Sequence, residues 1–288
     1  MAELPISDLR ALLRPEDMVF SDAANHASIV DGLRLSRAQK VIFPHLDLDI
    51  LESELRNAGK AQKFIVTESV FSMDGDLAPI SDLAALAERY GAELIVDEAH
   101  ATGVIGSQGR GMAASAGLTG RVLATVHPCG KALAGVGAFI CCSETLKQFL
   151  INRARTFIFS TALPPYIAAQ MRAALKIVAS ADTGRERLAS ISYSLRARLR
   201  EAGFDTAHSN SQIVPVILGE NERAVRFAEQ LARAGFGVRA IRPPTVPPGT
   251  SRLRISLNVT LSDSVLSGLV DELVRIRDRK AIPAASAI

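Results

Sequence analysis

The sequence predicts an α/β protein with a mainly parallel sheet. Short apolar runs rich in β-branched residues alternate with segments of helical periodicity through the first half of the chain, which is typical of βαβ units. The chain has 288 residues, of which 48% are hydrophobic and 22% are charged, so it can bury one large domain or two smaller ones. This composition excludes disordered and fibrous proteins.

The first domain is expected over residues 1–162. Its predicted strands are Met18–Ser21, Val41–Pro44, Lys63–Glu68, Glu93–Asp97, Val122–Val126 and Ala138–Cys142. Helices are predicted between some of them, at Leu48–Asn57 and Asp82–Tyr90, and Ser81 is expected to be the N-cap of the second helix.

A smaller α+β domain is expected over residues 163–288. It begins at Pro164 and Pro165, because this pair cannot lie inside a helix. Its predicted elements are helices at Tyr166–Ala181 and Arg185–Ala202, strands at Ile213–Leu218, Val238–Ile241 and Arg252–Leu257, a helix at Ser262–Arg277, and a frayed tail at Pro283–Ile288.

Charge and cysteine content restrict the partners. The 33 basic and 30 acidic residues give a net charge of +3 and are scattered, whereas binding to a nucleic-acid backbone requires a basic stripe. The three cysteines, Cys129, Cys141 and Cys142, lack the spacing of a metal site and suit a reducing compartment. No segment approaches the roughly 20 apolar residues of a membrane span. We expect a soluble, cytoplasmic protein with small-molecule substrates, no metal, and no nucleic-acid or membrane partner.

The window LIVDEAHATGVIGSQGRG, residues 94–111, contains the first candidate site. Asp97 ends an apolar strand, and ligands collect at the carboxyl ends of strands in α/β sheets. Asp97 could pair with a protonated ring nitrogen and His100 could donate to a phenolic oxygen; a helix N-cap is the alternative role for Asp97. The glycines from Gly103 to Gly111 indicate a turn-rich loop, because the order of elements and the Lys-Ser/Thr ending of a phosphate loop are absent.

The window HPCGKALAGVGAF, residues 127–139, places Lys131 between a predicted strand and the next one. Lysine is the usual nucleophile that captures carbonyl groups, and a lysine held as an imine avoids the cost of burying a charge. The alternative is a lysine whose head group reaches solvent from a loop. This window alone leaves both interpretations open.

Three further windows supply polar side chains near strand ends. His26 lies in SDAANHAS and Ser72 in TESVFSMDGD, where a capping histidine and a simple turn are the alternatives. Arg252 and Arg254 alternate along a strand that follows a proline-rich loop, so they are expected on one face of it. An arginine on a rigid strand suits bidentate recognition of a carboxylate, and surface charge is the alternative.

Together these windows resemble the α-oxoamine synthases, a branch of the fold-type-I, class-II aminotransferase-like enzymes that use pyridoxal 5'-phosphate (PLP). The resemblance covers nearly the whole chain and is carried by SDAANHASIVDG, TESVFSMDGDLAPI, LIVDEAHATGVIGSQGRG, CGKALAGVGAF, RARTFIFSTALPP and IRPPTVPPGTSRLRISL. It implies a mainly parallel, seven-stranded type of sheet with helices on both faces, a PLP-binding large domain, a small C-terminal domain and a homodimer.

The resemblance also implies which residues bind the cofactor and carry the chemistry. Lys131 would hold PLP as a Schiff base, Asp97 would pair with the pyridinium nitrogen, and His26 would stack on the ring and assist decarboxylation. Ser72 and His100 would lie near the phenolic oxygen.

Four other residues would bind the phosphate or the substrates. Ser160 and Thr161 would approach the phosphate across the dimer interface, Arg254 would hold the amino-acid carboxylate, and Thr245 would lie near the acyl group. The loop that precedes Arg254 resembles the branch that joins L-alanine to a pimeloyl thioester, bound to CoA or to a carrier protein, with loss of carbon dioxide. Relatives that use glycine, to make 2-amino-3-oxobutyrate or aminolevulinate, and one that uses serine are the alternatives.

The chain departs from the family in two respects. Pro128 stands where the family has a threonine that contacts the cofactor, so we expect weaker cofactor binding. Family members also carry an N-terminal stretch, with a substrate-site arm and a phosphate-binding turn, before the segment that matches residues 13–26. A shortened, non-catalytic PLP-fold dimer is therefore an alternative. A nucleotide-binding α/β protein is disfavoured because we find no phosphate loop.

Overall fold

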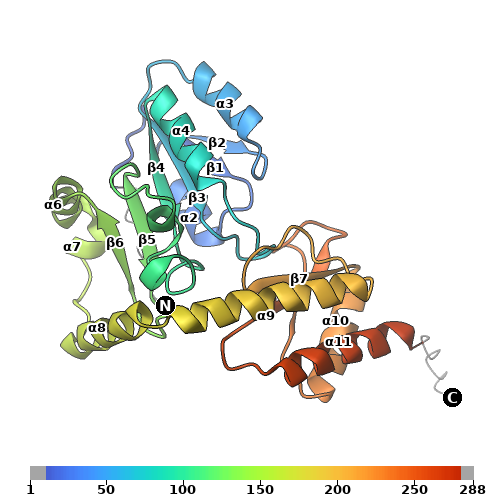
Figure 1. Cartoon of the computed structure of the whole chain (residues 1–288). Coiled ribbons are helices and arrows are strands. Elements are labelled where there is room, and N and C mark those ends of the chain that lie inside the picture. Colours follow the sequence, from blue (N-terminus) through green and yellow to red (C-terminus); the bar gives the residue numbers. More distant parts are fainter. Residues whose placement is uncertain (1–10, 280–288) are drawn as a thin grey trace. The chain divides into compact units, whose positions relative to one another are not determined.

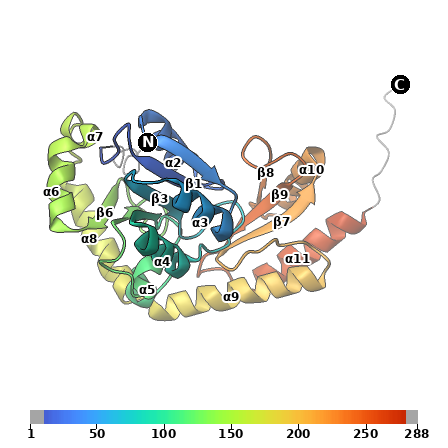
Figure 2. The same cartoon turned by 90° about the horizontal axis from the view of Figure 1, so that it is seen from above.

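The computed structural model describes residues 11–279 and divides them into two units (Figures 1 and 2). The first unit consists of residues 11–71 and 77–182, and the second of residues 72–76 and 183–279. The expected boundary between residues 162 and 163 stays a prediction. The expected tail at 283–288 lies outside the described residues.

A six-stranded sheet forms the centre of the first unit, in the order β2-β1-β3-β4-β5-β6. Its strands are β1 (Met18–Asp22), β2 (Gln39–Phe43), β3 (Lys63–Glu68), β4 (Ala92–Asp97), β5 (Ala124–Pro128) and β6 (Ala138–Cys142). Neighbouring strands from β2 through β5 are parallel, and β6 is antiparallel to β5. The mainly parallel sheet is confirmed, and the described residues supply six strands of the expected seven-stranded type.

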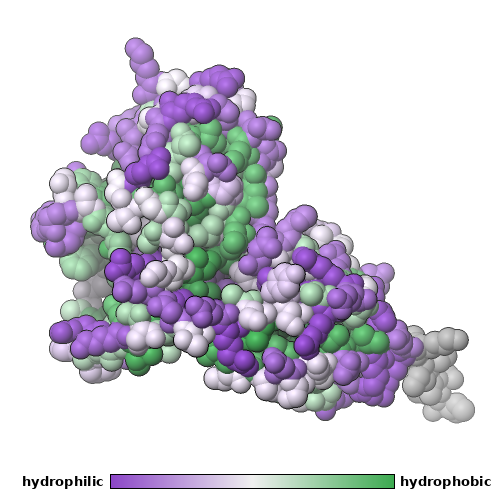
Figure 3. Space-filling model, in the orientation of Figure 1, coloured by the Kyte–Doolittle hydropathy of each residue, from purple (hydrophilic) through white to green (hydrophobic). Residues whose placement is uncertain are grey.

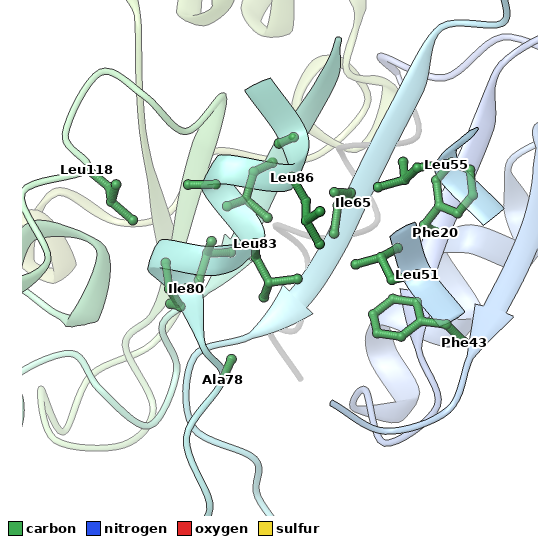
Figure 4. Close-up of a cluster of buried hydrophobic side chains, with 14 of the residues drawn as sticks. Phe20, Phe43, Leu51, Leu55, Ile65, Ala78, Ile80, Leu83, Leu86 and Leu118 are labelled. Atoms are coloured by element: carbon green, nitrogen blue, oxygen red, sulfur yellow. The ribbon is translucent and has the colours of Figure 1, made fainter. Parts of the chain in front are cut away.

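Helices cover both faces of this sheet because its central strands are apolar on both sides. In β3, Ile65 packs in one core cluster, whereas Phe64 and Val66 pack in another. Figure 4 shows the first cluster, in which Leu83 and Leu86 of one helix approach Ile65. The helices of the first unit are α2 (Ala27–Leu35), α3 (Leu48–Asn57), α4 (Ile80–Tyr90), α5 (Met112–Ser115), α6 (Glu144–Arg153), α7 (Arg155–Ile158) and α8 (Pro165–Ala179).

The start of α4 differs from the prediction. Its N-cap is Pro79, which makes no side-chain capping bond, so Ser81 lies inside the first turn. Ile80 is buried against the core, and this apolar contact extends the helix beyond the residue that capping chemistry alone would choose. The predicted bounds of α3, β3 and β6 are confirmed.

The second unit packs helices against a three-stranded antiparallel sheet in the order β7-β9-β8. Its elements are α9 (Asp182–Glu201), β7 (Ile213–Gly219), α10 (Asn221–Arg233), β8 (Arg239–Ile241), β9 (Ser251–Ser256) and α11 (Asp263–Asp278). The amphipathic helix α10 buries Ala224, Phe227 and Leu231. Ser262 caps α11, since its side chain accepts a hydrogen bond from the Val265 N–H.

Residues 72–76, from the β3–α4 connection, belong to the second unit. Asp74 forms an ion pair with Arg252 of β9, and the Asn210 N–H donates to the Gly75 carbonyl at 3.0 Å. Arg252 is only 4% exposed, so it is a buried partner of this segment and contributes little surface charge. The segment that carries Ser72 is therefore anchored to the strand that carries Arg254.

Gly75→Ala is expected to destabilise the protein strongly. Gly75 has a φ of +70°, and a Cβ atom would lie 2.0 Å from the Ile213 carbonyl oxygen. Backbone strain and displacement of this segment should lower the free energy of unfolding by about 3 kcal/mol or more, measured by chemical denaturation. Gly59→Ala is the matched control, because Gly59 has a φ of +62° and no atom within 4 Å of the added Cβ. Equal losses in the two variants would contradict this close packing.

Candidate active site

Three buried acids lie at the carboxyl ends of adjacent parallel strands. They are Asp22 on β1, Glu68 on β3 and Asp97 on β4, with exposed fractions of 2%, 2% and 5%. Glu68 and Asp97 are paired in the register of β3 and β4. Parallel strands end at one edge of a sheet, and this edge is where α/β folds bind ligands.

The Asp97 carboxylate is buried and held by the backbone. Its Oδ1 accepts a hydrogen bond from the Ala99 N–H at 2.8 Å, and the residues that follow form turns, so it does not cap a helix. Burial raises the pKa of Asp97 to about 6, while the Ala99 hydrogen bond and the positive charge of Lys131 act in the opposite direction. Asp97 therefore favours a cationic partner at this strand end.

Lys131 lies in the tight connection between β5 and β6. The Cys129 N–H donates to the Gly137 carbonyl at 2.9 Å, and the Ala134 N–H donates to the Lys131 carbonyl at 3.0 Å. The Lys131 side chain is exposed, as in the alternative interpretation of this window, so its amine is accessible. Burial raises the pKa of both Glu68 and Asp97, and the positive charge of Lys131 offsets part of each rise. Lys131 and Asp97 are thus brought together.

His26 is the N-cap residue of α2, which agrees with the capping role considered from sequence. Its Nδ1 accepts a hydrogen bond from the Ser28 N–H at 3.2 Å and lies 2.8 Å from the Ser28 Oγ. The backbone N–H of His26 opposes the rise in the pKa of Glu68, so the start of α2 lies near this acid.

The other expected residues of the first unit occupy two places. His100 is half-buried in the turns after β4, and Ser160 and Thr161 are exposed between α7 and α8. The glycine-containing segment from Gly103 to Gly111 forms turns and a three-residue 3₁₀ helix, as predicted for a turn-rich loop.

Three expected residues belong to the second unit. Ser72 is buried in the anchored segment 72–76, Thr245 lies in the loop between β8 and β9, and Arg254 lies on β9 opposite Pro215 and Arg239. Their roles toward the first unit stay predictions.

Sequence reasoning missed Glu68 and Glu98. Glu68 ends the apolar run KFIVTE as Asp97 ends ELIVD, and this shared pattern was an available signal. Glu98 is fully buried and accepts hydrogen bonds from Ser69 Oγ, Met112 N–H and Ala113 N–H at 2.8, 3.0 and 2.8 Å. Glu98 thus anchors the start of α5.

A cavity of about 960 Å³ in the first unit is lined by Glu98, Thr102, His127 and Phe139, among others, and not by Lys131. His127 bonds Thr102 and Thr125, both at 2.8 Å, and stacks on Phe139. Burial lowers the pKa of His127 to about 4, so its ring is neutral at physiological pH. These contacts give His127 a structural role.

The chemistry of the Lys131 site fits a protonated pyridine ring that carries an aldehyde. Asp97 supplies a buried negative charge for a ring nitrogen, and Lys131 supplies an accessible amine for the aldehyde. Among residues 11–279, no group of three or more His, Cys, Asp and Glu side chains could hold a metal ion. No helix in the same range is both long and apolar enough to cross a membrane.

Comparison with known sequences identifies the family and close relatives. Residues 6–273 match the model of the family described as aminotransferase class I and II. An 8-amino-7-oxononanoate synthase from Geobacter sulfurreducens is 49% identical over 269 residues, which cover 92% of this chain and 69% of that protein.

Solved structures of enzymes with the same or a related name also match this chain. A serine palmitoyltransferase containing the PLP internal aldimine matches with a TM-score of 0.89 and 32% identity, over 96% of this chain and 69% of that one. An 8-amino-7-oxononanoate synthase from Francisella tularensis matches with a TM-score of 0.83 and 30% identity, over 95% of this chain and 79% of that one. Some of these structural neighbours contain PLP.

Proposed function

Because the chain belongs to the aminotransferase class I and II family, we propose that it is a PLP-dependent acyltransferase that forms 8-amino-7-oxononanoate in biotin biosynthesis. The reaction joins L-alanine to a pimeloyl thioester and releases carbon dioxide and the thiol. The observation that carries this proposal is the placement of Asp97 and Lys131 at one strand edge, in a chain 49% identical to a synthase of this type.

The residues of the first unit divide the chemistry among them. Bound PLP supplies an electron sink for the electron pair left on Cα of alanine. The Lys131 amine would hold the cofactor through its aldehyde and, once free, would be the base that takes the Cα proton of alanine. The Asp97 carboxylate would hold a proton on the ring nitrogen, and His26 would stack on the ring and assist decarboxylation by donating a hydrogen bond. His100 would bind the phenolic oxygen, and the family resemblance implies the same role for Ser72, which belongs to the second unit.

The substrates require further groups. Arg254 binds the alanine carboxylate as a guanidinium fork, and Thr245 contacts the acyl chain. The Cα electron pair forms the new bond to the acyl carbon, the thiol leaves, and the carboxylate leaves as carbon dioxide before a proton returns to Cα. The acyl donor is a CoA or carrier-protein thioester.

A homodimer is the proposed assembly, with Ser160 and Thr161 directed at the phosphate of the partner's site. The exposed aromatic residues around them support this proposal: Phe157, Phe159 and Tyr166 are 62%, 72% and 69% exposed. Exposed hydrophobic residues that gather on a surface mark interaction sites. Figure 3 shows one face of the molecule, on which hydrophilic and hydrophobic residues are mixed. The free cysteines among the described residues support a cytoplasmic location.

The test is product formation by the purified full chain. We expect 8-amino-7-oxononanoate, identified by mass spectrometry, from L-alanine and pimeloyl-CoA or the pimeloyl carrier protein, and slower product formation from glycine or serine. The glycine-using alternative predicts the reverse order of amino acids. A folded chain that binds PLP but makes no product with any of the three would support the non-catalytic alternative.

Pro128→Thr is expected to tighten PLP binding. Pro128 is the last residue of β5 and lacks the hydroxyl that the family's threonine offers the cofactor. One added hydrogen bond contributes about 1 kcal/mol, so the dissociation constant of PLP, measured by equilibrium dialysis, should fall roughly fivefold. Pro128→Val is the control, because it removes the proline ring without adding a hydroxyl. An equal gain from valine would show that the hydroxyl is not the cause.

A further inference from the structure

The side-chain amide of Asn25 continues the pairing between β1 and β3 after β1 has left the sheet. The backbone register of these two strands ends with Ser21 opposite Val66. Two positions further along β3, where the next donor toward β1 is expected, the Glu68 N–H donates to the Asn25 Oδ1 at 3.1 Å. The Asn25 Nδ2 donates to the Val66 carbonyl at 2.8 Å. One side-chain amide therefore binds both a carbonyl and an N–H at the end of β3.

The geometry requires an amide at this position. Asn25 is only 7% exposed, and its Nδ2 also donates to the Ser21 Oγ at 2.9 Å, so both hydrogens of Nδ2 and the Oδ1 are used. Aspartate has the same shape but no donor, and alanine has neither donor nor acceptor. The backbone N–H of Asn25 donates to the Asp22 carbonyl at 3.1 Å, which closes the turn between β1 and α2.

The same turn is held on its other side by Asp22. The Asp22 Oδ1 accepts the Ala24 N–H at 2.8 Å and lies 2.7 Å from the His45 Nδ1, and the Oδ2 accepts the Leu46 N–H at 3.0 Å. Asp22 thus joins the turn to the connection that follows β2, while Asn25 joins it to β3. The turn is fixed between two neighbouring strands of the sheet.

His26 directly follows Asn25 and begins α2. The Ser28 N–H donates to the His26 Nδ1 at 3.2 Å, so the neutral ring carries its proton on Nε2. Glu68, the residue that donates to Asn25, is paired with Asp97 in the register of β3 and β4. The Asn25 amide therefore holds the backbone of His26 at a strand end that adjoins the strand end of Asp97.

We propose that Asn25 is a positioning residue for His26: its amide fixes the start of α2 to the end of β3, so that the His26 ring is in place to stack on the cofactor with the Nε2 proton available. This inference rests on the proposed function for the role of the ring. The amide pairing and the place of His26 are properties of the chain itself, so both can be measured without PLP.

Amide hydrogen exchange of the PLP-free chain, measured by NMR, tests the pairing. Asn25→Ala removes all three side-chain hydrogen bonds, whereas Asn25→Asp keeps an oxygen for the Glu68 N–H. Relative to the Ile65 amide in the middle of β3, we expect the Glu68 amide to exchange about fivefold faster in Asn25→Ala and to stay protected in Asn25→Asp. The ratio to Ile65 removes any change in global stability. An unchanged ratio in Asn25→Ala, or an equal loss in both variants, would overturn the pairing.

The Ser28 amide reports the place of the His26 ring in the same chain. His26→Ala removes the acceptor of this amide and gives the rate without the ring. We expect Asn25→Ala to shift the exchange of Ser28 toward that rate although His26 is present. Asn57→Ala is the control, because Asn57 is an exposed asparagine of α3, and it should leave the Ser28 amide unchanged. Wild-type protection of Ser28 in Asn25→Ala would show that His26 keeps its place without the amide, and the proposal would be wrong.

A double-mutant cycle of PLP affinity tests the consequence for the cofactor. We expect Asn25→Ala to weaken PLP binding about tenfold when His26 is present and less than about twofold in the His26→Ala background, because the amide acts through the ring. A merely structural role gives equal losses in the two backgrounds, and that outcome would overturn the positioning role. Failure of wild type to bind PLP would instead overturn the proposed function, while the two exchange measurements still decide whether Asn25 holds His26.

Discussion

Lys131→Ala is expected to abolish covalent attachment of PLP and to reduce turnover by roughly 10³-fold or more, because one amine serves as both the attachment point and the base. The absorbance band of the covalently attached cofactor should disappear in the variant. Borohydride reduction followed by peptide mass spectrometry should place the cofactor on Lys131 in wild type. We expect attachment at Lys131 because its amine is exposed and because its positive charge acts on the Asp97 carboxylate.

Two controls separate chemistry from charge. Lys131→Arg keeps a positive charge near Asp97 but cannot attach PLP, so it should be as inactive as Lys131→Ala while binding PLP more tightly. Lys147→Ala removes an exposed lysine of α6 that pairs with Glu144, and it should leave absorbance and turnover unchanged. Reduction that labels another lysine in wild type would refute the assignment of Lys131.

Asp97→Asn is expected to lower turnover by roughly 10²–10³-fold, since a neutral amide cannot stabilise a positive charge on the ring nitrogen. The substitution keeps an oxygen for the Ala99 N–H, which donates to Oδ1 in wild type, so the local backbone should be retained.

Because Asp97 has a pKa of about 6, wild-type affinity for PLP should fall as pH drops through that value. The variant should lack this dependence, and PLP titrations at several pH values would show it.

The same substitution should stabilise the PLP-free protein. A carboxyl group whose folded pKa is raised contributes stability at low pH and loses it as pH rises from about 3.8 through about 6. At neutral pH the buried charge costs about 2–3 kcal/mol, which Asp97→Asn removes. Urea denaturation at neutral pH should therefore give a higher free energy of unfolding for Asp97→Asn than for the control Asp82→Asn, whose acid is exposed on α4. A less stable variant would show that Asp97 already has a compensating cation.

Local patterns predicted most of the elements because each strand and helix buries residues at its own periodicity. β3 and α3 have the bounds that their apolar spacing predicts. α4 does not, because the buried contact of Ile80 outweighs the capping chemistry of Ser81. α10 was not among the predicted elements, although Ala224, Phe227 and Leu231 have the spacing of one helical face.

The roles of Lys131 and Asp97 stay predictions. Their own windows left a solvent-exposed lysine and a helix N-cap open, and only the resemblance across several windows singled these two residues out. The hydrogen bond from the Glu68 N–H to the Asn25 Oδ1 could not be predicted, because it joins residues 43 positions apart. The Arg252–Asp74 ion pair joins residues 178 positions apart, a separation that no local pattern encodes.

The anchored segment 72–76 also determines how this protein can be divided. Because five residues of the first half of the chain are integrated into the second unit, no single cut in the sequence yields two complete folding modules. Residues 183–279 expressed alone would lack Asp74, leaving the buried Arg252 without its acid, and would lose the backbone of Gly75 that packs on Ile213. Chimeras that exchange these modules between homologues must therefore carry the short segment along with the C-terminal half. During synthesis, residues 72–76 are made first and can reach their final packing only after residues 183–279 have followed.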